Sequence, residues 1–226
     1  MRFLYSVKYQ KKRTFRHLTM VAILLILNSC GGDSNPSDVQ SNGTIDRVAA
    51  EFNLLVPMDA TIEKLAGGFA FTEGPVWDRR NNQLYFSDLS SNAIHTWSDS
   101  EGLKTYLKPV FDGETEHAMV GSNGLNIDSE GRLLLMEHGN RVVSRIEADG
   151  SRTILADDYN GNRLNSPNDS VWHSNGWLYF TDPPYGLAGL EQDPLRELAF
   201  NGIYRLNPES GEVQLLEQTQ SRPNGI

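Results

Sequence analysis

The sequence has one cysteine, Cys30, in 226 residues. A single cysteine excludes an intrachain disulfide and a metal site built from several thiolates. The apolar run near the N-terminus, residues 20–27, is 8 residues long, whereas a membrane-spanning helix needs about 20. Neither the G-x-S-x-G turn of serine hydrolases nor a glycine-rich phosphate loop occurs in the sequence, which argues against both of those chemistries.

Positive charge is scarce outside the first residues. The chain has 20 Lys and Arg against 29 Asp and Glu, and residues 1–29 contain six of the basic residues and no acidic one. Residues 30–226 therefore carry 14 basic and 29 acidic residues, a net charge of −15. So acidic a body argues against nucleic acid and anionic membrane surfaces as partners.

The N-terminal region has the pattern of a targeting segment. A basic stretch precedes the short apolar run, which predicts a secretory signal peptide over residues 1–29. The run ends in Leu-Asn-Ser-Cys30, followed by two glycines, which resembles a bacterial lipoprotein box. We therefore expect lipidation at Cys30 and a lipid-anchored protein of the bacterial envelope, on its periplasmic face or at the cell surface. The alternative is an ordinary cleaved signal peptide with an incidental cysteine.

Residues 30–46 are mostly Gly, Ser, Asn, Asp and Pro, a composition that predicts a flexible tether. From residue 47 to residue 226, short apolar and aromatic runs alternate with turn residues, and helical periodicity is weak. This pattern is typical of an all-β fold. Three matched second strands are predicted at 84–88, 133–137 and 178–182, and each ends in an acid, Asp88, Glu137 or Asp182. That regularity favours a structural role for the three acids.

An oxygen-bearing side chain recurs at intervals of 50, 45 and 56 residues, at the start of each predicted repeat. The four positions are Glu73, Asn123, Asn168 and Asn224. Strand-rich repeats of about 40–50 residues predict a β-propeller, whose inner strands face one central channel. A carboxylate and several amide oxygens converging there would suit a hard divalent cation, with Ca²⁺ the first expectation.

The length of the body limits the number of blades. Residues 47–226, at about 47 residues per blade, predict three blades and the start of a fourth, and a propeller needs at least four blades to close. We therefore expect the chain to be part of a longer protein. A further strand predicted near residues 61–65 could close the ring in that longer protein.

Four motifs, taken together and in order, resemble the gluconolactonase branch of the senescence marker protein, gluconolactonase and luciferin-regenerating enzyme-like family. They are E-G-P-V-W at 73–77, S-P-N-D at 166–169, T-D-P-P-Y-G at 181–186 and R-P-N-G at 222–225. The resemblance implies a six-bladed propeller, a divalent cation that is usually Ca²⁺ and sometimes Zn²⁺, and hydrolysis of a lactone or related ester.

The resemblance also implies roles for individual residues. Its metal ligands fall on Glu73, Asn168 and Asn224, and a fourth ligand, an Asp in a P-D-G motif, has no counterpart up to residue 226. Asn123, which shares the repeat position, is expected to line the channel or hold a metal-bound water, and Tyr185, in the loop at 182–185, is expected to wall the substrate pocket. Two further candidates are Asp169, as a residue that orients a ligand or water, and His138, as a general base or substrate contact.

Three interpretations remain open from the sequence. The first is a metal-dependent lactonase acting on a small-molecule lactone, with the cation polarising the carbonyl for attack by water. The second is a non-catalytic envelope propeller that binds a ligand or serves as a scaffold, since a fold alone fixes no function. The third keeps the metal site but hydrolyses another ester or a phosphotriester. The sequence does not identify the lactone, the ion, protein partners or the oligomeric state.

Overall fold

The computed structural model describes residues 2–8, 43–115 and 117–226. The apolar run at 20–27, Cys30 and residues 30–42 of the expected tether lie outside the described residues, so the anchor stays a prediction. Contacts divide the chain into two compact units, Phe3–Gly67 and a larger unit that contains Gly68–Ile226. Within the described ranges, no helix combines the length and apolar composition needed to span a membrane.

The described residues of the smaller unit, 3–8 and 43–67, contain little regular structure. Strand β1 (Arg2–Lys8) pairs with β2 (Thr61–Phe69), and a four-residue helix α1 (Phe52–Leu55) lies between them in the sequence. The guanidinium of Arg47 donates hydrogen bonds to the carbonyl oxygens of Val56 and Pro57, both at 2.6 Å. Residues 61–65, where a strand was expected, form the first part of β2.

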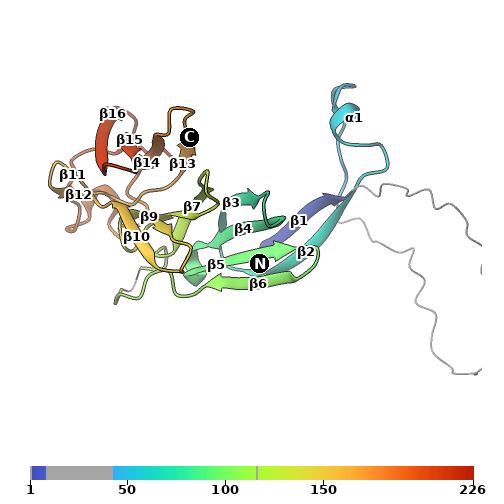
Figure 1. Ribbon diagram of the computed structural model, residues 1–226, viewed down its shortest axis with the longest axis horizontal. Helices are drawn as coiled ribbons and strands as arrows, with labels where there is room; N and C mark the ends of the chain where they lie inside the picture. The colour runs from blue at the N-terminus through green and yellow to red at the C-terminus, as the bar shows by residue number, and fades with distance from the viewer. Residues whose placement is uncertain (1, 9–42, 116) are drawn as a thin grey trace, which may run out of the picture. The chain divides into compact units, whose positions relative to one another are not determined.

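The larger unit is a set of antiparallel blades. In the part of the chain that is described, it contains three four-stranded sheets, each with its strands in sequence order (Figure 1). The first blade is β3 (Thr72–Asp78), β4 (Gln83–Asp88), β5 (Ala93–Ser98) and β6 (Gly102–Leu107). The second is β7 (Ser122–Ile127), β8 (Leu133–Glu137), β9 (Val142–Ile146) and β10 (Arg152–Ala156). The third is β13 (Ser170–Trp172), β14 (Leu178–Asp182), β15 (Gly202–Asn207) and β16 (Glu212–Glu217). The expectation of three β-propeller blades is confirmed.

Short elements lie inside two of the blades and between the second and third blades. The 3₁₀ turns η1 (Leu89–Ser91) and η2 (Leu190–Gln192) follow β4 and β14, and a small hairpin joins β11 (Asp158–Tyr159) to β12 (Asn162–Arg163). Residues 221–226, where a fourth blade was expected to start, contain no assigned strand.

The turn between the first two strands of each blade follows from its residues. Asn82, Gly131 and Gly176 have φ angles of 52°, 89° and 85°, the left-handed region that Gly and Asn tolerate best. The carboxylates of Asp78 and Asp128 accept the backbone N–H two residues ahead, both at 2.9 Å, which closes the turn locally.

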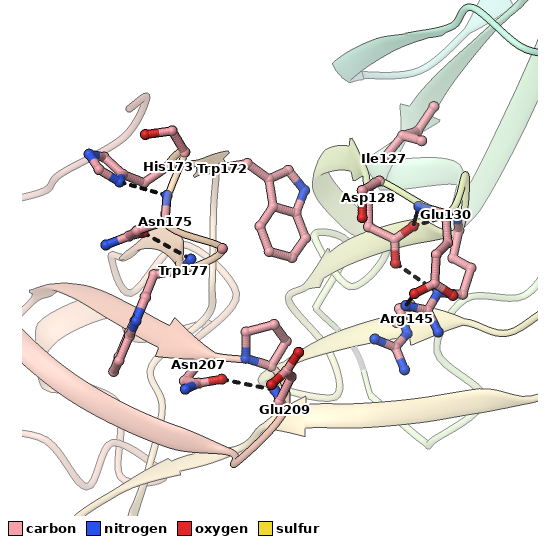
Figure 2. A pocket seen from close by; sticks show the side chains of 15 residues that line it. Ile127, Asp128, Glu130, Arg145, Trp172, His173, Asn175, Trp177, Asn207 and Glu209 are labelled. Atoms are coloured by element: carbon pink, nitrogen blue, oxygen red, sulfur yellow. Dashed lines mark hydrogen bonds and ion pairs between the residues drawn. The ribbon is translucent and has the colours of Figure 1, made fainter.

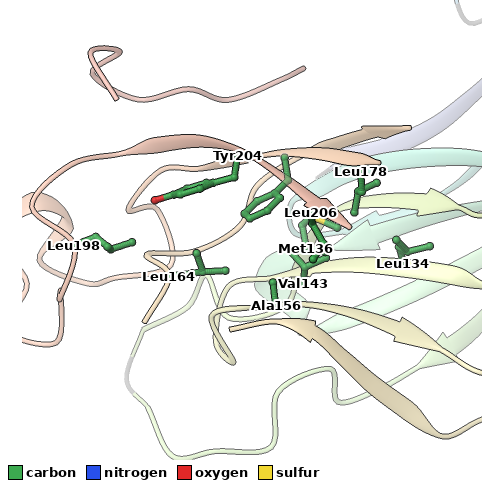
Figure 3. Close-up of a cluster of buried hydrophobic side chains, with 10 residues drawn as sticks. Leu134, Met136, Val143, Ala156, Leu164, Leu178, Leu198, Tyr204 and Leu206 are labelled. Carbon is green, nitrogen blue, oxygen red and sulfur yellow. The ribbon is translucent and has the colours of Figure 1, made fainter. Parts of the chain in front are cut away.

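The core lies between blades. Because side chains alternate along a strand, β8 can face two neighbours at once. Leu133 and Leu135 belong to a cluster shared with the first blade, whereas Leu134 and Met136 belong to one shared with the third. Figure 3 shows the second cluster, whose other buried members are Val143, Ala156, Leu164, Leu178, Phe180, Leu198, Tyr204 and Leu206. This packing fixes the positions of the inner strands.

Trp77 and Trp172, which share a repeat position, differ in environment. Trp172 packs against the cluster shared by the second and third blades. Trp77 is 45% exposed.

Candidate functional site

The four repeat positions lie on neighbouring segments. Gly124 donates its backbone N–H to the carbonyl oxygen of Asn168 at 2.7 Å. A Cβ placed on Gly74 would lie 2.2 Å from the carbonyl oxygen of Asn123. On the far side, the hydroxyl of Thr181 donates to the carbonyl oxygen of Asn224 at 2.6 Å. The segments that carry the four oxygen-bearing side chains are therefore neighbours in repeat order.

Each of the three inner strands is irregular at this position. In β3 the pairing with β4 shifts register directly after Glu73, and in β7 the pairing with β8 shifts around Asn123. Before β13, Asn168 donates its N–H to the carbonyl of Thr181 at 2.8 Å, and the carbonyl of Asp169 accepts from Thr181 at 3.1 Å. Two residues thus oppose one, which is a β-bulge. Bulges re-aim side chains and are common beside functional sites.

The expected metal ligands differ in exposure. Asn168 is 1% exposed, and its Nδ2 has no hydrogen-bond partner among the described residues. Glu73 is half-buried and Asn224 is exposed. The segment with Asn224 is also held by Arg222, whose guanidinium contacts the carboxylate of Glu191 at 2.6 and 2.7 Å.

The side-chain oxygens of Glu73, Asn168 and Asn224 are chemically suited to a hard cation. One carboxylate and two amide oxygens are ligands of the kind that Ca²⁺ takes, and Nδ2 of Asn168 has no hydrogen-bond partner among the described residues. Across residues 2–8, 43–115 and 117–226, no three His, Cys, Asp or Glu side chains gather into a possible metal site. A cation here would therefore depend on Asn oxygens, with Glu73 as the charged ligand.

The two residues expected to contact substrate lie on different blades, Asn123 in β7 and Tyr185 after β14. Asn123 is half-buried, and its carbonyl oxygen accepts a hydrogen bond from the hydroxyl of Ser87 at 2.8 Å. Tyr185 is half-buried in the loop after β14, and its carbonyl oxygen lies 3.1 Å from Nε2 of His117. Their predicted roles stay predictions.

Asp169 joins the third blade to its neighbours. Its carboxylate accepts the N–H of Ser170 at 2.8 Å and that of Ile226 at 3.3 Å. A Cβ added to Gly124 would lie 2.9 Å from the same carboxylate. The side chain therefore contacts segments of the second blade and of the final residues, which suits an orienting role without testing it.

His138 is completely buried. Neither ring nitrogen has a hydrogen bond of ordinary geometry within the described residues. Burial lowers the pKa of His138 to about 4, the backbone of Met119 opposes the shift, and the nearby His117 adds to it. The ring is therefore neutral at pH 7, packed beside Gly186 and Ser166. Sequence reasoning missed His117, since nothing in the pattern placed the loop before β7 beside Tyr185.

The repeated acids at the ends of the second strands are structural in two blades. Asp88 accepts the N–H groups of Ala70 and Phe71 at 3.1 and 2.8 Å. Asp182 accepts those of Asn165 and Ser166, both at 2.7 Å. Each carboxylate thus fixes the loop that enters the inner strand of its own blade.

Their environments set different pKa directions. Burial raises the pKa of Asp88, but the two amide donors and the Ser91 hydroxyl outweigh it and hold the pKa below its usual range. Burial raises the pKa of the Asp182 carboxyl to about 7, against the opposing effect of its amide donors. Glu137 in the second blade is also raised in pKa by burial, and its carboxylate contacts Ser144, Asn140 and Arg152 instead of a loop backbone.

A large cavity lies at the opposite ends of the inner strands. Its volume is about 710 Å³, and the turns after β7, β13 and β15 line it. In Figure 2, Trp172 lies between His173 and Trp177 on one side and Asp128 with Arg145 on the other. The strand starts with Asn123 and Asn168 do not line it, so size alone does not indicate the site.

Comparison with known proteins shows which family the chain resembles over most of its length. Residues 71–226 match the family model described as the SMP-30/Gluconolactonase/LRE-like region. The chain is 32% identical over 212 residues to a gluconolactonase of Zymomonas mobilis, in an alignment that covers 92% of this chain and 59% of that protein. The chain thus spans 59% of the length of that relative.

Solved structures agree with the fold. An X-ray structure of a protein described as a candidate gluconolactonase superposes with a TM-score of 0.68 at 32% identity, over 79% of this chain and 59% of the other. A gluconolactonase from Xanthomonas campestris gives a TM-score of 0.57 at 32% identity, over 68% of this chain and 49% of the other. A virginiamycin B lyase from Staphylococcus aureus, at 18% identity and a TM-score of 0.51 over 75% of this chain and 50% of the other, shares the fold alone.

Proposed function

Because the chain belongs to the SMP-30/gluconolactonase/LRE-like family, we propose that it hydrolyses a sugar lactone or a related ester. The observation that carries the proposal is the neighbouring placement of Glu73, Asn168 and Asn224 at one end of the blades. The identity of 32% to a gluconolactonase supports the same reaction class. The proposed substrate is a small-molecule lactone, which would bind at the half-buried polar residues where the inner strands start.

The side-chain oxygens of Glu73, Asn168 and Asn224 would hold a divalent cation. A cation bound there would polarise the lactone carbonyl and stabilise the developing oxyanion. The all-oxygen donor set favours Ca²⁺, since Zn²⁺ in proteins takes mostly nitrogen and sulfur ligands.

The remaining residues orient the site and keep its charge low. Two of the three ligands are neutral, so Glu73 alone would offset the charge of a bound cation. Asn123, in β7, and Tyr185, in the loop after β14, would form the substrate side of the site, and the carboxylate of Asp169 holds the N–H of Ile226 beside Asn224. His138 is neutral at pH 7, so it adds no positive charge next to the loop that carries Tyr185.

The proposal is tested by removing the cation and its charged ligand separately. We expect EDTA, and independently Glu73→Gln, to lower the rate of gluconolactone hydrolysis by about 100-fold or more, the scale of losing one group that stabilises an oxyanion. A pH-stat or indicator assay measures the rate, and added Ca²⁺ should restore activity after EDTA treatment.

The matched control is Glu130→Gln. Glu130 lines the cavity at the opposite ends of the strands, and its side chain is 68% exposed. Its substitution should leave hydrolysis unchanged. Turnover that survives both EDTA and Glu73→Gln would contradict the metal site, and an unaltered chain that hydrolyses no lactone would contradict the proposed function.

A further inference from the structure

Asp88 and Asp182 each accept hydrogen bonds from the loop that precedes one of the proposed ligands. Asp88 accepts the N–H groups of residues 70 and 71, which lie three and two positions before Glu73. Asp182 accepts the N–H groups of residues 165 and 166, which lie three and two positions before Asn168. In each case an acid at the end of the second strand holds the loop that leads directly to the ligand.

Both carboxylates are shielded from water. Asp88 is 2% exposed and Asp182 is 0% exposed. Hydrogen bonds from backbone N–H groups to carboxyl oxygens gain strength where water is excluded. The loops before Glu73 and Asn168 are therefore held firmly at the point where each chain enters its bulge.

The second blade lacks this arrangement. Glu137 occupies the same repeat position, but its carboxylate contacts the side chains of Ser144, Asn140 and Arg152. The loop N–H of Gly121, two positions before Asn123, donates instead to the carbonyl oxygen of Leu89. Asn123 is the repeat position that was not assigned as a metal ligand. The carboxylate–loop contact thus occurs in the two described blades that supply a ligand and not in the one that does not.

We propose that Asp88 and Asp182 are positioning residues for cation binding, each fixing the loop that presents Glu73 or Asn168. This inference rests on the proposed function, because it assumes that those two side chains bind the ion. Supporting groups behind metal ligands commonly change affinity by about 10- to 100-fold when they are removed. An Asn in place of either Asp keeps the volume but puts an NH₂ group against one of the two amide donors, so the loop loses one acceptor.

The test measures Ca²⁺ and Zn²⁺ binding to the 226-residue chain by titration calorimetry, with Asp88→Asn and Asp182→Asn compared against the unaltered sequence. We expect each variant to bind the preferred ion about 10- to 100-fold more weakly. In assays of lactone hydrolysis, the ion concentration needed for half-activation should rise in each variant. At saturating ion, kcat should return to the value of the unaltered chain. A general loss of folding would lower kcat at every ion concentration.

Asp78→Asn is the matched control. Asp78 is 3% exposed and also accepts two loop N–H groups, from Arg80 and Asn81, but at the opposite end of β3. Glu137→Gln is the second control, at the same repeat position in the blade without a ligand. Both should keep ion affinity within about twofold, whatever they cost in thermal stability. If Asp182→Asn does not fold, Asp88→Asn decides the question against Asp78→Asn.

The outcomes separate the two proposals. An unaltered chain that binds the ion, with unchanged affinity in Asp88→Asn, would overturn the positioning role and leave the proposed function standing. An affinity that falls equally in Asp78→Asn would overturn it as well, because the effect would then be one of stability. An unaltered chain that binds neither ion would overturn the proposed cation site, and the positioning role with it, whereas the proposed function itself fails only if the unaltered chain hydrolyses no lactone.

Discussion

At the scale of single residues, burial decides which charge states are available. His138 is 0% exposed, and its pKa of about 4 means that its buried ring resists protonation through the neutral range. An unfolded histidine titrates near 6.5. The two states of the chain therefore bind a different number of protons between these two values.

This difference predicts a pH dependence of stability. Above pH 6.5 the ring is neutral in both states, and as pH falls the unfolded chain takes up a proton that the folded chain cannot. The free energy of unfolding should therefore decrease between about pH 6.5 and pH 4, by about 3 kcal/mol from His138. Urea unfolding at a series of pH values measures it.

His138→Leu should lack this part of the pH dependence, whatever its stability at pH 7. The control variant His173→Leu, at a position whose side chain is exposed, should keep the pH dependence of the unaltered chain. A variant His138→Leu with the same slope between pH 6.5 and pH 4 as the unaltered chain would show that His138 does not resist protonation.

At the scale of elements, the bulges are the feature on which the candidate site depends. Each bulge lies at or directly after an oxygen-bearing residue of the repeat. In the first two blades, the bulge contains the glycine that follows that residue. A small residue is needed there because the next blade's backbone approaches closely. A Cβ at Gly124 would lie 2.6 Å from the carbonyl oxygen of Asn168.

Gly124→Ala should therefore destabilise the protein by about 1–3 kcal/mol through overpacking against backbone that cannot yield. Gly225 is a matched control, because it follows an Asn at the same repeat position but a Cβ there would come no closer than 3.7 Å to Asp169. Thermal unfolding compares them, and equal stability of the two alanine variants would show that the close approach of the blades carries no cost.

At the scale of the whole molecule, β8 joins the three blades into one packed body. Leu134 and Leu135 are both 0% exposed and face different blades. Truncating either to Ala should cost about 2–5 kcal/mol, from lost apolar contact and the cavity left behind.

The two truncations should differ in where protection is lost. Leu134→Ala should raise amide hydrogen exchange mainly in β14 and β15, and Leu135→Ala mainly in β4 and β5, because each cavity opens toward one neighbour. Hydrogen exchange read by mass spectrometry distinguishes them. The same exchange profile in both variants would mean that the blades unfold as one unit and not by neighbouring pairs.

The sequence by itself determined the strands, the turns and the family. Alternating apolar residues and positions such as Asn82 or Gly131 act over a few residues, so local chemistry was enough to place β4, β8 and β14 nearly to the residue. The same periodicity placed Glu73, Asn123, Asn168 and Asn224 in phase, and the motifs around them identified the family that residues 71–226 match.

The tertiary structure alone decided what each of those residues touches. Asp88, Glu137 and Asp182 are alike in sequence, yet two hold loop amides and one contacts side chains. The burial of His138, the exposure of Trp77 and the closeness of His117 to Tyr185 likewise depend on segments far away in the chain. The physical reason is that hydrogen bonding and desolvation are set by what packs from the neighbouring blade, which no local pattern encodes.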